Sequence, residues 1–169
     1  MASGGLGTPS HLAGELFKFM TGVNMIHVPY PGDTPAVVRE VLDGHVQVFF
    51  PAVAAPTEHI RSSRLRALAV TTSMRSEVLP EVPTVAETVP GYETTFWVGV
   101  GAPSGTPPAI LECLNLAINA GLTDPKMKMR LAEIDITALP GSSAEFGKLM
   151  VQETEKWAKV IQAANIKVQ

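Results

Sequence analysis

The chain has 169 residues, of which 46% are hydrophobic and 17% are charged, and its formal net charge is −3 at pH 7. This length supports one domain with a real core or two small lobes, and the composition excludes an intrinsically disordered chain. Charges are spread without long blocks, which argues against nucleic acid and against an anionic membrane surface as partners. No apolar run approaches the roughly 20 residues that span a bilayer, and the sequence opens without the pattern of an export signal.

Short β-branched runs alternate with helical patterns along the chain. Strands are predicted at 25–30, 46–50, 65–71 and 96–102. Helices are predicted at 9–21, 34–43, 56–62, 107–121, 125–133 and 143–164. This alternation predicts an α/β fold with mainly parallel sheets, in which ligands bind at the carboxyl ends of the strands.

A segment between Thr71 and Thr95 divides the chain into two predicted parts. It contains prolines and alternating charges but no sustained period. We expect residues 1–95 to form one α/β lobe and residues 96–169 to contribute one strand and long helices.

Few residues suit catalysis or metal binding. The four histidines, His11, His27, His45 and His59, have neither helical i,i+4 spacing nor a cysteine partner, so no metal site is predicted. Motifs for a nucleophile elbow, a phosphate loop or a dinucleotide site are absent from the sequence, so no catalytic residue and no cofactor is predicted. The single Cys113 excludes an internal disulfide, and its spacing predicts a place in a helix core.

The stretch GLGTPSHLAGELFKFM, residues 5–20, predicts a helix that begins after Thr8. A glycine-rich lead-in precedes Thr8 as the cap, and Pro9 fills the first helical position. His11 stands where a capping box would place Glu or Gln, so the first turn lacks an acid. This partly positive helix end is a candidate site for an external anion.

A second Thr-Pro pair repeats this pattern. GDTP at 32–35 follows the strand that ends at Tyr30, so both helix N-termini would face the same edge of a parallel sheet. Two such ends would form a cradle for an anion. Ordinary helix capping explains the same residues, since GTPP at 105–108 opens a third helix elsewhere.

Several blocks of the sequence share order and spacing with one receptor family. They are GTPSHLAGELFKFM, HVPYPG, LRALAVT and VPTVAET. Over essentially its whole length the chain resembles the substrate-binding proteins of tripartite tricarboxylate transporters, the Bug family. The resemblance implies a non-enzymatic periplasmic receptor with a two-lobe, type II periplasmic-binding-protein-like architecture, whose partners are membrane transporter subunits.

The resemblance also implies the ligand and the residues that bind it. Family members hold a small mono- or dicarboxylate through backbone N–H groups, hydroxyls and bridging waters. The matching positions here are Ser3, Gly7, Thr8, His11, Tyr30, Gly32 and Thr34. For Ser3 and Tyr30, roles in turns and packing explain the residue as well as ligand contact does, and His27 is expected to be structural.

In the family, an export signal and several βα units precede the part that matches here. The resemblance therefore implies that residues 1–95 are the middle lobe and that residues 96–169 return to a first lobe, which would be incomplete. Without those units the apolar faces of 107–121 and 143–164 would be exposed to water. We expect a homo-oligomer that covers them.

Three functions remain open from the sequence. The favoured one is a receptor that captures a small carboxylate. The second is a truncated relative that self-associates as a structural or interaction module and binds no small ligand. The third is an enzyme with His11 as general base, which is disfavoured because no second acid, base or nucleophile accompanies it by spacing.

Overall fold

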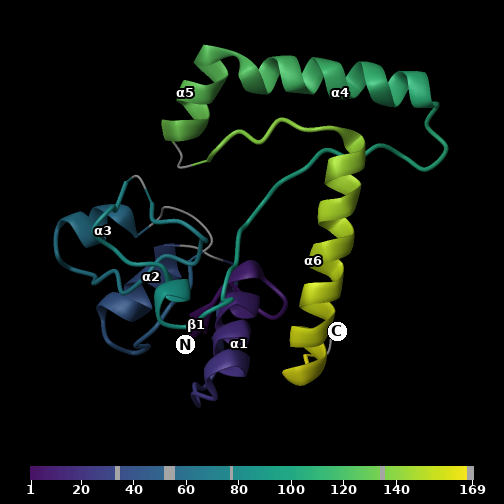
Figure 1. The fold of residues 1–169 in the computed structure, drawn as a ribbon. Coiled ribbons are helices and arrows are strands. Elements are labelled where there is room, and N and C mark those ends of the chain that lie inside the picture. The colour runs from purple at the N-terminus through teal and green to yellow at the C-terminus, as the bar shows by residue number, and fades with distance from the viewer. Residues whose placement is uncertain (33–34, 52–55, 77, 134–135, 167–169) are drawn as a thin grey trace. The chain divides into compact units, whose positions relative to one another are not determined.

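The computed structural model describes residues 1–32, 35–51, 56–76, 78–133 and 136–166 (Figure 1). The chain divides into two compact units. The first comprises Met1–Phe96 together with Trp157–Gln169, and the second comprises Trp97–Lys156.

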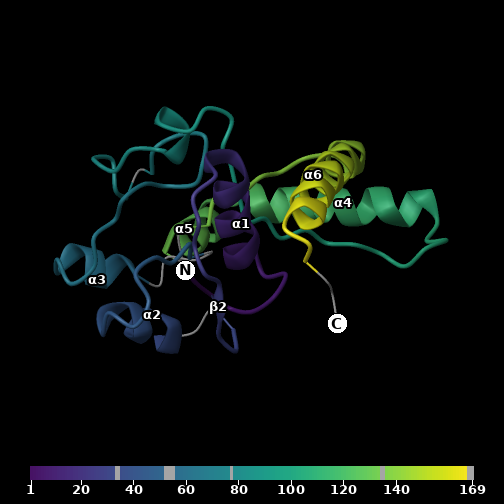
Figure 2. The same ribbon diagram turned by 90° about the horizontal axis from the view of Figure 1, so that it is seen from below.

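A small parallel sheet lies at the centre of the first unit. Strand β1 (Ala2–Ser3) pairs with strand β2 (Val28–Pro29), with Ala2 opposite Val28. Ala2 also forms an isolated parallel bridge with Phe49. Because successive residues of a strand direct their backbone groups to opposite sides, β1 lies between β2 and the Phe49 segment. Helices α1 (Pro9–Thr21) and α2 (Pro35–Leu42) both contact β1. Figure 2 shows the two helices together with strand β2.

The first unit has two small cores. Leu16 of α1, Val85, Tyr92 and Val160 form one cluster, against which Trp157 packs. Val85 begins a short 3-10 helix, η1 (Val85–Glu87), and a further short helix, α3 (Thr57–Arg61), precedes it in the chain. The second cluster is formed by Ala2 of β1, Val37 of α2 and Val46. Burial of these side chains fixes α1 against η1 and the end of α6, and α2 against β1.

The second unit contains α4 (Pro108–Thr123), α5 (Pro125–Glu133) and the first part of α6 (Ser143–Ala163), whose end belongs to the first unit. Pro125 begins α5 directly after the extended residue Asp124, so the chain turns between the two helices (Figure 1). The Asn119 amide donates to the Gly141 carbonyl oxygen at 2.9 Å and accepts the Gly141 N–H at 3.0 Å. This pair joins α4 to the segment before α6.

Every predicted helix is confirmed to within two residues. The strand predictions are weaker: 25–30 contains β2, while 46–50 and 65–71 contribute only isolated bridges at Phe49 and Val70. The predicted strand at 96–102 is wrong, since these described residues form no strand. A strand needs a neighbour for its backbone groups, and within the described part of the chain the backbone of this segment is hydrogen-bonded to no other segment.

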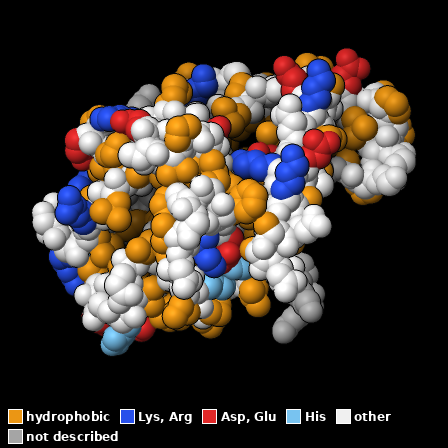
Figure 3. All heavy atoms as spheres, turned by 60° about the horizontal axis from the view of Figure 1, so that its bottom comes forward, with side chains coloured by type: hydrophobic (Ala, Val, Ile, Leu, Met, Phe, Trp, Pro, Cys, Tyr) orange, Lys and Arg blue, Asp and Glu red, His pale blue; other side chains and the backbone are white. Residues whose placement is uncertain are grey.

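Hydrophobic side chains occupy much of the surface drawn in Figure 3. Helix α4 has no buried residue, and Ile110 and Leu114 are 50% and 45% exposed. The prediction that Cys113 is a core residue is therefore wrong: its helix lacks a covering layer, and Cys113 is exposed. Among the described residues, no helix has the length and hydropathy needed to cross a membrane.

Candidate functional site

The loop Gly4–Thr8, here called the glycine loop, connects β1 to α1. Gly5 and Gly7 have φ values of 121° and 74°, which are backbone conformations that residues other than glycine rarely adopt. The Gly4 N–H donates to Ser10 Oγ at 3.0 Å, and the Gly4 carbonyl accepts the N–H of Gly32 at 2.9 Å. The last bond ties the glycine loop to residues 30–32, which follow β2 and are here called the second loop.

Thr8 caps α1 and closes the glycine loop. Its Oγ1 donates to the Gly5 carbonyl oxygen at 2.7 Å and accepts the N–H of His11 at 3.4 Å. The first turn of α1 holds no acidic residue. The helix end therefore keeps its partial positive charge without a side-chain anion of its own.

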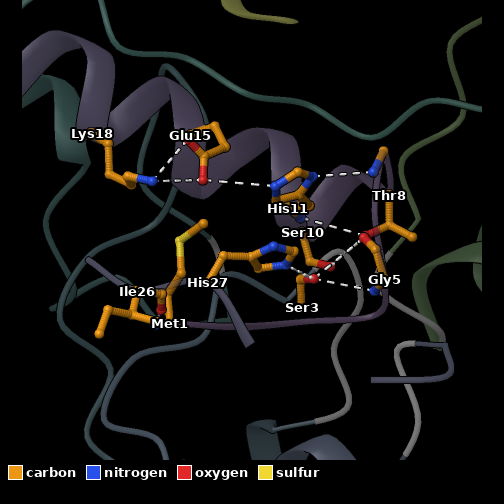
Figure 4. A network of polar contacts seen from close by, with 11 residues as sticks. Met1, Ser3, Gly5, Thr8, Ser10, His11, Glu15, Lys18, Ile26 and His27 are labelled. Atoms are coloured by element: carbon orange, nitrogen blue, oxygen red, sulfur yellow. Dashed lines mark hydrogen bonds and ion pairs between the residues drawn. The ribbon is translucent and has the colours of Figure 1, made fainter. Parts of the chain in front are cut away.

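Ser3, in β1, contacts the glycine loop at Gly5, as Figure 4 shows. It is fully buried, at 0% exposure. Its Oγ accepts the N–H of Gly5 at 3.1 Å and lies 2.5 Å from His27 Nε2. Ser3 is thus an anchor of the loop, and the predicted alternative of a structural role fits its burial. His27 is engaged in the same anchor, in line with the structural role expected of it.

His11 holds the other end of the loop. The ring is 2% exposed, and its Nδ1 accepts the N–H of Gly7 at 3.1 Å. It stacks on His27 with ring centroids 3.9 Å apart, and its Nε2 lies 3.7 Å from Glu15 Oε1. Glu15 in turn is paired with Lys18 at 2.8 Å.

Both histidines are held in the neutral form. Burial is the main cause that lowers the pKa of His11, against the raising effect of Glu15. Burial and then the neighbouring His11 lower the pKa of His27 to about 4. Since Nδ1 of His11 accepts a hydrogen bond, its proton sits on Nε2, toward Glu15.

The second loop brings fewer groups to the site. The Tyr30 N–H donates to the Ser3 carbonyl oxygen at 2.9 Å, while its hydroxyl donates to Glu40 Oε2 of α2 at 3.1 Å. Gly7 and Gly32 are exposed and Thr8 is half-buried. Thr34 lies outside the described residues, so its predicted place in the site stays a prediction.

Sequence reasoning missed two partners in this network. Ser10, in the first turn of α1, accepts the Gly4 N–H, and its hydroxyl lies 3.1 Å from Thr8 Oγ1. A serine two residues after a threonine cap is a local signal for such a contact. The pairing of His27 with Ser3 and His11 had no local signal, because it joins residues far apart in the sequence.

The network does not form an accessible nucleophile. The Ser3 hydroxyl touches His27 as in a serine–base pair, yet Ser3 has no exposed surface for a substrate to reach. Across the described part of the chain, no three histidine, cysteine or acidic side chains gather as a metal site would require. The site is a hydrogen-bonded glycine loop before a helix N-terminus, an arrangement suited to binding an anion.

A parallel strand, a glycine loop and a helix N-terminus without an acid are features that this chain shares with α/β proteins that bind ligands at strand ends. The sequence profile described as the tripartite tricarboxylate transporter family receptor (TctC) matches residues 1–166. The chain belongs to this family, and the resemblance seen in the sequence is confirmed.

Two curated relatives, both UPF0065 proteins, show how far the similarity extends. The protein from the tcbD-tcbE intergenic region of Pseudomonas sp. strain P51 is 40% identical over 162 residues, which are 95% of this chain and 48% of that protein. The protein from the clcB-clcD intergenic region of Pseudomonas knackmussii is 36% identical over 159 residues, or 93% of this chain and 94% of that one. The chain thus spans about half the length of the first relative and nearly all of the second.

Two solved structures share the fold. Rpa4515 of R. palustris, described with adipate, matches with a TM-score of 0.83 and 38% identity over 98% of this chain and 55% of that one. MatC from Rhodopseudomonas palustris, described with bound malate, matches with a TM-score of 0.71 and 27% identity over 95% of this chain and 55% of that one. The predicted α/β, periplasmic-binding-protein-like fold class is confirmed.

Proposed function

We propose that this chain holds a carboxylate group of a small mono- or dicarboxylate as part of a periplasmic solute receptor for a tripartite tricarboxylate-type uptake system. The observation that carries the proposal is the glycine loop at the N-terminus of α1, whose first turn has no acid. A ligand carboxylate supplies the negative charge that the helix end lacks. Family membership and the ligands named for Rpa4515 and MatC support it.

The predicted site residues take different roles in this proposal. Gly7 and Gly32 are exposed and Thr8 is half-buried, so a ligand can reach these three residues. Ser3 and His11 are buried and shape the loop, so they act on the ligand through the backbone that they hold. Tyr30 belongs to the second loop, and a contact of Thr34 with the ligand is part of the proposal. No catalytic role is assigned to any of them, because the relatives are described as receptors and binding proteins.

Isothermal titration of the chain with adipate and with malate tests the proposal. We expect saturable binding of at least one, and a ligand at 100 times its Kd should stabilise the fold by about 2.7 kcal/mol in a parallel thermal melt. Adipamide, which has the length of adipate but no charge, is the control and should not bind. Equal binding of adipamide, or flat titrations for both acids up to millimolar concentration, would contradict an anion site.

The exposed side of α4 favours self-association as a second candidate function. Ile110, Leu111, Leu114 and Leu116 are each more than a third exposed, and so many exposed large apolar side chains on one helix are unusual for a soluble monomer. We expect a homodimer or larger homo-oligomer in sedimentation velocity, with Leu114→Glu shifting it to monomer and Glu112→Gln, on the same helix, leaving it unchanged. A wild-type monomer at micromolar concentration would rule this out. A substitution of Trp157 would not test self-association, because Trp157 packs on the core cluster of the first unit and its loss would also affect folding.

A further inference from the structure

Two stacked histidines reach the two ends of the glycine loop. His11 takes the N–H of Gly7 on its Nδ1, and His27 contacts Ser3, which takes the N–H of Gly5. The rings themselves lie nearly parallel, 19° apart (Figure 4). Gly5 also carries the carbonyl to which Thr8 donates. The shape of the loop therefore depends on hydrogen bonds that end on two imidazoles.

A proton on His11 would oppose one of these bonds directly. Nδ1 then becomes a donor and faces the Gly7 N–H, which is also a donor, so the 3.1 Å contact cannot persist. A proton on His27 keeps Nε2 as a donor to Ser3, which can accept it because the Ser3 hydroxyl donates to the Gly5 carbonyl oxygen at 3.3 Å. The effect of that proton is instead the charge that it places against the ring of His11, whose centroid lies 3.9 Å away. Protons on both rings would place two like charges in stacking contact.

The charged groups around the pair have opposing effects. Glu15 of α1 favours a proton on either ring, whereas Lys18 of the same helix disfavours it. The Met1 ammonium, next to β1, disfavours a proton on His27. Because Lys18 is paired with Glu15 at 2.8 Å, much of the carboxylate's attraction for the rings is offset, and burial keeps both neutral.

We propose that His11 and His27 are positioning residues for the carboxylate site: they hold the glycine loop in its binding shape only while both rings are neutral, so acidification releases the loop and weakens carboxylate binding. The inference rests on the proposed function, because its readout is affinity for a carboxylate. The folded chain disfavours protons on these rings, so the effect is absent above the ordinary histidine pKa of about 6.5 and develops as the pH falls below it.

The test compares malate affinity at about pH 7.5 and about pH 5 by isothermal titration, for the wild type and for His11→Asn. Asparagine offers its Oδ1 as an acceptor for the Gly7 N–H and does not titrate. Free malate has the same ionisation in both titrations. A difference between the wild type and His11→Asn in the ratio of affinity at about pH 7.5 to affinity at about pH 5 therefore comes from the protein. We expect the wild type to lose more affinity than His11→Asn, by up to the roughly 30-fold that one proton contributes over the about 1.5 pH units between the ordinary histidine pKa and pH 5. His59→Asn, on α3, is the matched control and should behave like the wild type.

Two results would overturn the inference: equal losses in the wild type and in His11→Asn, or a wild-type affinity that rises on acidification because an imidazolium attracts the anion. If malate and adipate bind to none of these proteins at neutral pH, the proposed function fails, and the positioning role is then judged without ligand. Nuclear magnetic resonance of the chain should show the Gly5 and Gly7 amide signals shifting in step with titration of the His11 ring, and a Gly7 amide that stays fixed through that titration would refute the positioning role by itself.

Discussion

Replacing Tyr92 by alanine should lower the free energy of unfolding by about 3–5 kcal/mol, the range for removing a large aromatic side chain from a core. Tyr92 is 1% exposed and belongs to the cluster that joins α1, η1 and the end of α6. Its ring meets Phe17 edge to face with centroids 6.0 Å apart. Alanine would leave a cavity where these three segments meet, and urea unfolding monitored by circular dichroism measures the loss.

Tyr92→Phe separates the ring from the hydroxyl. The hydroxyl donates to the Ala13 carbonyl oxygen of α1 at 3.0 Å, inside the core. Phenylalanine keeps the packing and removes this bond, so we expect a loss of about 1 kcal/mol. Equal losses for the alanine and phenylalanine variants would show that the hydrogen bond, rather than the filled volume, stabilises this cluster.

Ser3→Ala should lower the free energy of unfolding by about 1–3 kcal/mol, the cost of leaving buried polar groups without partners. The Gly5 N–H and the His27 ring both contact Ser3 Oγ, and Ser3 has no exposed surface through which water could replace it. The same change should loosen the glycine loop. Urea unfolding of the variant at neutral pH gives the stability directly.

Ser73→Ala provides the matched control, because Ser73 is exposed in the same unit. A serine at the surface contributes little, so the change should stay within about 0.5 kcal/mol of the wild type. If Ser3→Ala lowers the free energy of unfolding no more than Ser73→Ala does, then Ser3 does not anchor the loop, and the contacts from His27 to Thr8 do not stabilise the fold.

Helix ends were predictable from the sequence because their signals are local. Pro9, Pro108 and Pro125 each begin a helix. Ser142 and Glu145 form a reciprocal cap, in which the Ser142 N–H donates to Glu145 Oε2 at 2.7 Å and the Glu145 N–H donates to Ser142 Oγ at 3.2 Å. Such a cap involves residues only three apart. The strand predicted at 96–102 failed because a strand exists only where a distant segment pairs with it, and a β-branched run does not contain that information.

The candidate site divides in the same way. Thr8 as a cap and the missing acid at His11 follow from a few adjacent residues, and both are confirmed. The role of Ser3 depends on His27, which is 24 positions away, and on the parallel pairing of β1 with β2. Strand β1 itself was missed, because two residues next to a glycine-rich loop carry no period that a pattern can detect.

The bare surface of α4 sets a limit on how that helix is stabilised. With no buried residue in α4 or α5, the two helices depend on their own backbone hydrogen bonds and on the Asn119–Gly141 pair, and helices of this length are marginal in water without packing. Their amide protons should therefore exchange with solvent through local fraying, independently of the unfolding of the cluster around Tyr92. We therefore expect α4 and α5 to unfold separately from the cluster around Tyr92, so that a denaturation curve recorded on one of them does not describe the other.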